Sequence, residues 1–224
     1  MPKISVLTPT IRPKGLERVM ESLEKQTFQD FELLVEVGLP YKGCDLSASL
    51  NRMVKRSKGE LIVMLQDYIE INYQGLERFW KRHEEYPKTL MTGPKGVTKN
   101  LKSCGEVYYT NELAWDWRTQ GILHEIQPLQ WEADWASAPR QAFFDVGGYD
   151  EEYDMGWSWE NAEIAIRIAK AGYNFMVDPE NIAIGWNHND FEPHPFNFPG
   201  NLNSHRFDET QRKLAGGLYK LNYL

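Results

Sequence analysis

The sequence predicts an α/β fold in which a mostly parallel central sheet is flanked by helices. The clearest observation is a run of five apolar residues, 61–65, which follows Gly59 and stops abruptly at Gln66-Asp67. Continuous apolar runs of this length are typical of strands buried on both faces of a parallel sheet. The second observation is that strand and helix patterns alternate from residue 3 to residue 65, which demands right-handed crossovers and parallel strands.

Length and composition limit the classes of protein that fit. At 224 residues the chain can bury one large core or two small ones, with one domain expected, and its formal charge of −7 argues against a nucleic-acid partner. Two cysteines, the lack of a long apolar run and the lack of a signal-peptide pattern favour a cytoplasmic protein without a transmembrane segment. Nothing in the sequence specifies an oligomeric state.

In the first half, helices show apolar residues at a spacing of three and four, and glycine, proline or polar residues end each strand. A proline-punctuated loop at 9–13 is expected to end the first strand. The expected elements are a strand at 3–8, a helix at 14–26, a strand at 31–37, a helix from Asp45 or Ser47 to near Gly59, a strand at 61–65, a helix at 73–86 and a strand at 89–97.

The second half is less regular. Residues 98–128 show no clear period and are expected to form an insertion or a flexible acceptor-side segment. The expected elements are a strand at 131–138, a turn rich in glycine and acidic residues at 143–151, a helix at 160–171, strands at 175–177 and 182–186 that close the sheet, and a polar tail from 187 with a short helix near 209–214.

The carboxyl ends of the first three strands meet at one edge of such a sheet, which is where ligands bind in open α/β folds. That edge collects residues 8–12, Glu36 and Asp67. A solvent-facing carboxylate at a strand end suits a hard divalent cation, although Asp67 also fits a strand that simply ends in a polar turn. His188 follows the last strand and could complete a ligand set for Mn²⁺ or Mg²⁺, or it could be an ordinary surface residue.

Several stretches, in order along the chain, resemble glycosyltransferases of the GT-A (Rossmann-like) fold, especially the large inverting family 2. They are Ile4 to Thr10, Leu50 to Arg52 with Ser57 to Asp67, and Val146 to Glu151. The segment Trp157 to Arg167, followed by Trp186 to His188, is similar to the acceptor-side block of galactosyltransferases and polypeptide N-acetylgalactosaminyltransferases. The resemblance covers about residues 3–190. It implies one domain, 1–224, with a nucleotide-binding half at 1–97, an acceptor half at 98–190 and a C-terminal tail or lid at 191–224.

On the donor side, the resemblance implies a site that binds a nucleotide-diphosphate sugar. It places Asp67 in the Asp-x-Asp motif that holds the metal and the diphosphate, with His188 as a second metal ligand. Gln66 and Tyr68 depart from that motif, because the family often has carboxylates there, and Glu70 is a spare carboxylate. The other implied donor-side residues are Thr8, Pro9, Thr10 and Arg12 beside the nucleotide, Glu36 near the base or ribose, and Asn51.

On the acceptor side, the resemblance places Glu160 where an inverting enzyme needs a carboxylate to deprotonate the acceptor hydroxyl. Asn161 stands where the family has a second acid, and Glu163 is the reserve base. The indole faces of Trp157 and Trp159 could hold an acceptor sugar. Without the resemblance, the sequence favours the interpretation of Glu160 as an ordinary helix N-terminal glutamate stabilised by the helix dipole.

The sequence therefore predicts a metal-assisted glycosyltransferase of polysaccharide biosynthesis. It would move a sugar from a nucleotide-diphosphate sugar, with UDP expected, to a carbohydrate hydroxyl with inversion. The alternative from another functional class is a binding protein: a relative that binds carbohydrate or nucleotide sugar and has no catalytic activity. A sugar-phosphate nucleotidyltransferase ranks lower because residues 8–14 lack glycine, and a dehydrogenase is disfavoured because no Gly-x-Gly-x-x-Gly turn follows the first strand.

Overall fold

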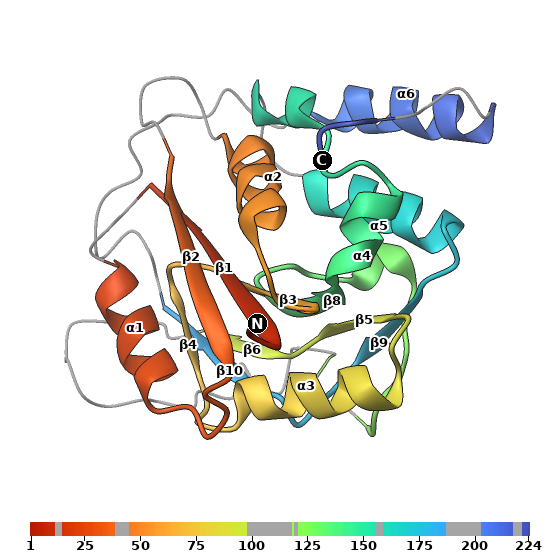
Figure 1. Cartoon of the computed structure of the whole chain (residues 1–224). Helices are drawn as coiled ribbons and strands as arrows, with labels where there is room; N and C mark the ends of the chain where they lie inside the picture. The colour runs from red at the N-terminus through yellow and green to blue at the C-terminus, as the bar shows by residue number, and fades with distance from the viewer. Residues whose placement is uncertain are drawn as a thin grey trace.

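A computed structural model of the chain describes residues 1–11, 15–38, 45–97, 118, 121–155, 159–186, 203–216 and 221–224 (Figure 1). Within these residues a seven-stranded sheet forms the centre, with the strand order β2-β1-β3-β8-β5-β9-β7. Its strands are β1 (Ile4–Thr10), β2 (Phe31–Val37), β3 (Leu61–Leu65), β5 (Thr89–Thr92), β7 (His124–Glu125), β8 (Trp135–Pro139) and β9 (Asn174–Val177).

The central sheet is mostly parallel, as the sequence predicts. β1 pairs in parallel with both β2 and β3, and β5 pairs in parallel with β9. β8 runs antiparallel to its neighbours β3 and β5, and β7 runs antiparallel to β9. β8 therefore begins at the edge where β3 ends, so two segments far apart in the chain meet beside the end of β3.

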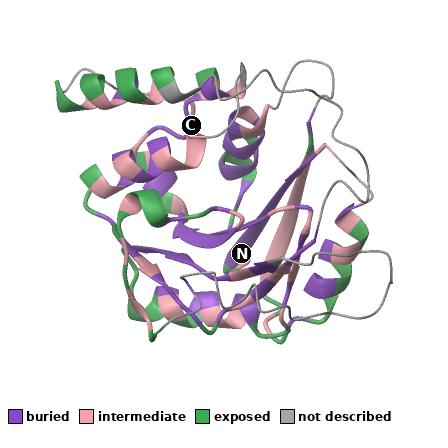
Figure 2. Ribbon diagram, turned by 180° about the vertical axis from the view of Figure 1, so that it is seen from behind, coloured by how far each residue is buried: buried purple, intermediate pink, exposed green. Residues whose placement is uncertain are grey.

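Helices cover both faces of this sheet (Figure 1). One core cluster joins α2, α4 and α5 to one face, and another joins α1 and α3 to the other face. All five residues of β3 are buried, alternately in these two clusters, which confirms the strand with two buried faces (Figure 2). The helices are α1 (Leu16–Glu24), α2 (Leu46–Arg56), α3 (Gly75–Glu85), α4 (Arg140–Asp145), α5 (Glu160–Lys170) and α6 (Asn203–Ala215).

A separate three-stranded sheet lies beside the central one. It has the order β4-β10-β6, from β4 (Ile69–Ile71), β10 (Ala183–Gly185) and β6 (Lys95–Val97). The expectation that the strand at 182–186 closes the main sheet is therefore wrong. The single strand expected at 89–97 is divided into β5 and β6 because Gly93-Pro94 interrupts it, and proline has no N–H for a strand ladder.

Other boundaries differ from the sequence-based expectations for local reasons. β1 continues through Pro9 to Thr10. The pairing of β1 with β3 stops at Leu7, so Pro9 has a neighbouring strand, β2, on one side only, and a proline is tolerated there. β4, β7 and α4 are not anticipated by the sequence patterns, and α6 is longer than expected. Short 3₁₀ turns occupy Pro128–Gln130 and Glu151–Met155. Among the helices that the structure describes, none combines the length and apolar character needed to cross a bilayer.

Candidate functional site

The first part of the site lies at the carboxyl ends of β1 and β3, and we call Thr8, Pro9, Thr10 and Asp67 the strand-end site. The Thr10 hydroxyl donates a 2.6 Å hydrogen bond to Oδ2 of Asp67. Both side chains are buried, with exposures of 4% and 3%. The expectation of a solvent-facing Asp67 is therefore wrong.

Asp67 is covered because the start of α1 lies directly on it. A Cβ atom at Gly15 would stand 2.5 Å from the Asp67 carbonyl oxygen, so only glycine permits this approach. Beside it, the Thr8 hydroxyl is buried and has no hydrogen-bond partner among the described atoms. Arg12, predicted to lie next to the nucleotide, is outside the described residues.

The other predicted donor-side residues contact the chain itself. Glu36 pairs with Arg52 at 3.3 Å and with Arg56 at 2.6 Å, both on α2. Asn51 binds the turn after α4: its amide donates to the Tyr149 carbonyl and to Glu151, while its oxygen accepts from the Tyr149 N–H. Both residues stabilise the framework of this edge, and their contact with substrate stays a prediction.

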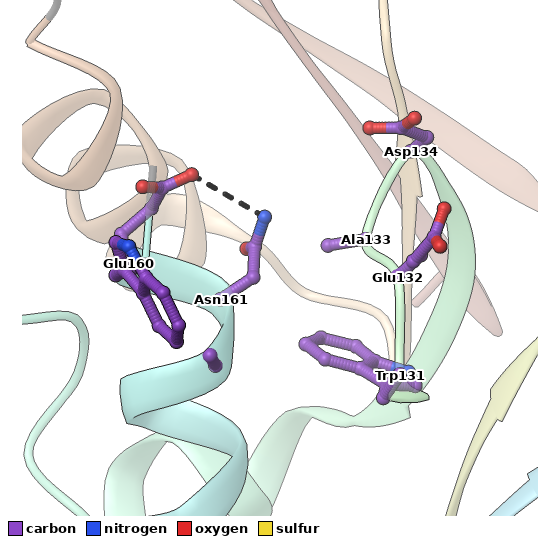
Figure 3. Close-up of a pocket in the computed structure, with 8 residues that line it drawn as sticks. Trp131, Glu132, Ala133, Asp134, Glu160 and Asn161 are labelled. Carbon is purple, nitrogen blue, oxygen red and sulfur yellow. Dashed lines mark hydrogen bonds between the residues drawn. The ribbon is translucent and has the colours of Figure 1, made fainter. Parts of the chain in front are cut away.

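The second part is an open pocket of about 240 Å³ at the start of α5, which we call the α5 pocket (Figure 3). One wall is the segment that leads into β8, and the other is the first turn of α5. The segment reaches the strand-end site because the Gln66 N–H donates to the Asp134 carbonyl at 3.1 Å. The pocket residues are Trp131, Glu132, Ala133, Asp134, Trp159, Glu160, Asn161 and Ala162.

The three carboxylates of the α5 pocket have different partners. Asp134 forms an ion pair with Lys95, and Glu132 forms one with Arg118 at 3.3 Å. Within the described part of the chain, Glu160 forms no ion pair; its nearest side-chain partner is the Asn161 amide at 3.4 Å (Figure 3). Glu160 is thus the pocket acid whose charge is not matched by a nearby cation.

The surroundings of Glu160 favour its protonated form. Burial raises the pKa of Glu160 above its ordinary value, a hydrogen bond from its own backbone opposes this, and the charges of Asp154 and Asp134 add to the rise. Asn161 orients the carboxylate, because its oxygen accepts from the Tyr149 hydroxyl at 3.3 Å while its amide faces Glu160. A carboxyl with a raised pKa in a pocket has the properties of a general base.

Glu163, expected as the reserve base, has a different environment. Its side chain is fully buried, and both of its oxygens accept hydrogen bonds from Arg167, at 2.5 and 2.6 Å. Arg167 also donates to the carbonyl of Val146. The pKa of Glu163 is raised by burial and lowered by Arg167. Glu163 ties α5 to the turn after α4, so its assignment as reserve base is wrong.

Trp159 precedes α5 in a left-handed conformation, with φ of 76°. Its ring packs against Phe207 of α6, with 4.5 Å between ring centroids, and its buried indole N–H has no acceptor among the described atoms. Helix α6 therefore holds Trp159 at the pocket wall. Trp157 lies outside the described residues.

Asp154 connects the short 3₁₀ turn Glu151–Met155 to the start of α2. Its carboxylate accepts from the backbone N–H groups of Ser47 and Ala48, at 2.6 and 2.9 Å, at the start of α2. Burial raises the pKa of Asp154 to about 6, although these two N–H donors oppose the rise.

Sequence reasoning missed Asp134, Lys95 and Asp154. Asp134 falls inside the strand expected at 131–138, which starts only at Trp135. No local signal marks Asp134, because its place at the end of β3 depends on β8 running antiparallel to β3.

The described residues supply few ligands for the expected Mn²⁺ or Mg²⁺. No group of three or more His, Cys, Asp or Glu side chains that could hold a metal occurs among them. Asp67 has the oxygen chemistry of a hard-cation ligand, whereas the nearby Glu70 accepts from the Trp186 indole at 3.1 Å. The predicted second ligand, His188, lies outside the described residues. One ligand on this edge therefore fits the metal, and the rest of its shell stays a prediction.

Comparison with known proteins supports the fold. The chain is 25% identical over 186 residues to "Probable N-acetylgalactosaminyltransferase 9" of Caenorhabditis elegans; the match covers 75% of this chain and 31% of that protein. Structures of S. aureus TarS 1–349, with UDP and without it, superpose with TM-scores of 0.61 and 0.62 at 15% identity, covering 84% of this chain and 62% of TarS 1–349. No protein-family model matches the chain.

The chain thus has a GT-A glycosyltransferase fold, as the resemblance implied. It spans about a third of the curated relative's length and less than two thirds of the TarS chains.

Proposed function

We propose that this protein is a glycosyltransferase that moves a sugar from a UDP-sugar to a hydroxyl of a carbohydrate acceptor, with inversion. The observation that carries the proposal is that the two sites are neighbours: Gln66, the residue before Asp67, donates its N–H to the carbonyl of Asp134, which lines the α5 pocket with Glu160. The likeness to a TarS structure in complex with UDP supports the nucleotide, and the name of the nematode relative supports transfer of a sugar.

In this proposal Glu160 removes the proton of the acceptor hydroxyl. The acceptor oxygen then bonds to the anomeric carbon, the bond from that carbon to the diphosphate oxygen breaks, and its electron pair leaves with the diphosphate. Glu160 suits the role because its pKa is raised, whereas Asp134 and Glu132 are already paired with cations. Trp159 offers an apolar indole surface for a sugar ring at the same pocket, whereas Trp131 is only 2% exposed and packs in the core behind it.

On the donor side, Asp67 and Thr10 would orient the diphosphate at the strand ends. A divalent cation, Mn²⁺ or Mg²⁺, would be held by Asp67 and by His188, and it would supply a positive charge for the leaving diphosphate. The roles of Thr8, Pro9, Arg12, Glu36, Asn51 and Trp157 toward substrate, like a cytoplasmic location and a part in polysaccharide biosynthesis, stay predictions.

A thermal-shift screen of UDP and UDP-sugars, with Mn²⁺ and with EDTA, tests donor binding first, because a ligand of the native state raises its melting temperature. UDP release in the presence of mono- and oligosaccharide acceptors then tests transfer. Stabilisation by UDP together with acceptor-dependent UDP release is expected. No stabilisation by any nucleotide would reject the proposal.

The second candidate is a silent nucleotide-sugar-binding relative. It is favoured by the single carboxylate at the end of β3, where Gln66 and Tyr68 flank Asp67, and by Asn161 beside Glu160. Binding of UDP-sugar without hydrolysis or transfer to any acceptor would support this candidate instead.

A further inference from the structure

A lysine with no role in the sequence-based site stands between the two parts of the site. Lys95 is the first residue of β6, and its side chain is only 17% exposed. Its ammonium pairs with Asp134 and lies 5.5 Å from the centroid of the Tyr68 ring. Lys95 therefore contacts the α5 pocket on one side and the neighbour of Asp67 on the other.

The path of the Lys95 side chain is set by the neighbouring strand. β10 pairs with β6, and a Cβ atom at Gly185 would stand 2.9 Å from Cδ of Lys95 and 3.0 Å from its Cγ. The absence of a side chain at Gly185 leaves room for the lysine stem to cross β10. The ammonium is thus directed toward Tyr68 and Asp134 by the packing of the small sheet.

The strand-end site needs positive charge if it binds a diphosphate, because Asp67 is itself an anion and would repel the phosphates. Tyr68 occupies a position next to Asp67 where a further metal-binding acid is common in the resembling family. The Lys95 ammonium sits over that tyrosine. An ammonium has three hydrogen-bond donors, so Lys95 can keep its ion pair with Asp134 and also donate to phosphate oxygens.

We propose that Lys95 is a donor-binding cation: its ammonium binds the diphosphate of the nucleotide sugar beside Asp67, so that part of donor binding needs no divalent metal. Asp134 holds this ammonium in place and, by competing for its charge, limits how tightly the diphosphate is bound. The inference rests on the proposed function, since it assumes a nucleotide-diphosphate ligand at the strand ends.

The test is the affinity for UDP, measured by calorimetry in EDTA and again in Mn²⁺. Removing one charge-assisted contact in Lys95→Gln should weaken UDP binding in EDTA by roughly 10- to 100-fold. Asp134→Asn should act in the opposite direction and tighten binding in EDTA, because it removes a carboxylate that competes with the diphosphate for the ammonium. The double variant should bind UDP with the affinity of Lys95→Gln, since Asp134 affects UDP binding only through its ion pair with Lys95.

Two further variants distinguish the effect of the Lys95 charge on UDP affinity from the effect of net charge or of a general loss of structure. Lys88→Gln changes the net charge equally, but this exposed lysine precedes β5 and lies at the opposite edge of the sheet, so UDP affinity should not change. Gly185→Ala should displace the Lys95 stem and lower UDP affinity in EDTA in the same direction as Lys95→Gln.

Each outcome decides the inference. Equal UDP affinity of wild type and Lys95→Gln in EDTA would overturn it, as would wild-type binding that occurs only with Mn²⁺; the proposed function survives both results. UDP binding by the wild-type protein in neither condition would overturn the inference and the proposed function together.

Discussion

The strand-end site and the α5 pocket place their carboxylates in different surroundings. At the strand ends, Asp67 is covered by the start of α1 and bonded to Thr10, so its position is set by the backbone of two adjacent strands. In the α5 pocket, Glu160 stands at the first turn of a helix with an amide neighbour and other acids nearby. The first arrangement gives a fixed anchor, and the second gives a group whose protonation can change during a reaction.

The same contrast recurs within a single helix. Glu160 and Glu163 are one turn apart on α5, yet Glu160 lines a pocket and Glu163 is fully buried against Arg167. Burial raises the pKa of both carboxyls, but only Glu163 has a cation that opposes the rise. A raised pKa therefore identifies a catalytic carboxylate only when the group is also accessible to a ligand.

The largest effect is expected for Glu160→Gln, which keeps the shape of the side chain and removes the base. Loss of a positioned general base should lower kcat by roughly 10²- to 10⁴-fold, while affinity for UDP-sugar stays unchanged. Transfer rate and donor affinity are measured side by side. Because its pKa is raised, wild-type activity should also increase with pH through a value above that of an ordinary glutamate.

A Glu160→Gln protein with near wild-type kcat would exclude this residue as the base. Loss of donor binding instead of kcat would place Glu160 in the nucleotide site. An α-linked product from a UDP-α-sugar would overturn the inverting mechanism.

Glu163→Gln should act on stability instead of chemistry, because it removes the buried carboxylate that pairs with the guanidinium of Arg167. Breaking a buried ion pair costs about 3–5 kcal/mol, which for a chain of this size lowers the melting temperature by roughly 6–20 °C. Thermal unfolding is the measurement. The double variant Glu163→Gln/Arg167→Met should regain much of the loss, and a stable Glu163→Gln protein with impaired kcat would contradict the contrast between the two glutamates.

Asp67→Asn should weaken binding of UDP with Mn²⁺ by roughly 10- to 100-fold, since it removes the charge and retains an oxygen that can accept from Thr10. Calorimetry measures the affinity. Thr10→Val, which removes the hydrogen bond and keeps the charge of Asp67, should cost about 1 kcal/mol of stability and should lower UDP affinity less than Asp67→Asn does. Unchanged Mn²⁺-dependent UDP affinity in Asp67→Asn would remove Asp67 from the site.

The smallest effect concerns the pH dependence of stability through Asp154. Its pKa is raised to about 6 in the folded protein, so its contribution to stability is fully present below the ordinary aspartate pKa and is lost as the pH rises toward about 6. After allowance for partial exposure the change is about 1–2 kcal/mol.

Denaturant unfolding of wild type and Asp154→Asn from pH 4 to pH 7 measures this contribution of Asp154. The stability of wild type relative to the variant should fall across that range. A constant difference between the two proteins would show that folding does not raise the pKa of Asp154.

Several features of the site could be read from the sequence because their signals are local. The apolar run 61–65 with its polar end predicted a buried strand that stops at Asp67, and the structure shows that strand as β3. The helical spacing after Glu160 predicted α5, which starts at that residue. The charges of Glu163 and Arg167, four apart on one helix, were also a readable signal of an ion pair, although their burial was not.

The sequence by itself determined the alternation of strands and helices from β1 to β3, helix α5, and the placement of Asp67 and Glu160 at element ends, because each depends on a few neighbouring residues. Only the tertiary structure decided that β8 runs antiparallel to β3, that Asp134 therefore meets the end of β3, and that Lys95 reaches it from a second sheet. Pairing partners far apart in the chain are selected by packing of the whole molecule, which leaves no local pattern in the sequence. The accessibility of Glu160 and the burial of Glu163 were decided in the same way, by which elements cover each turn of α5.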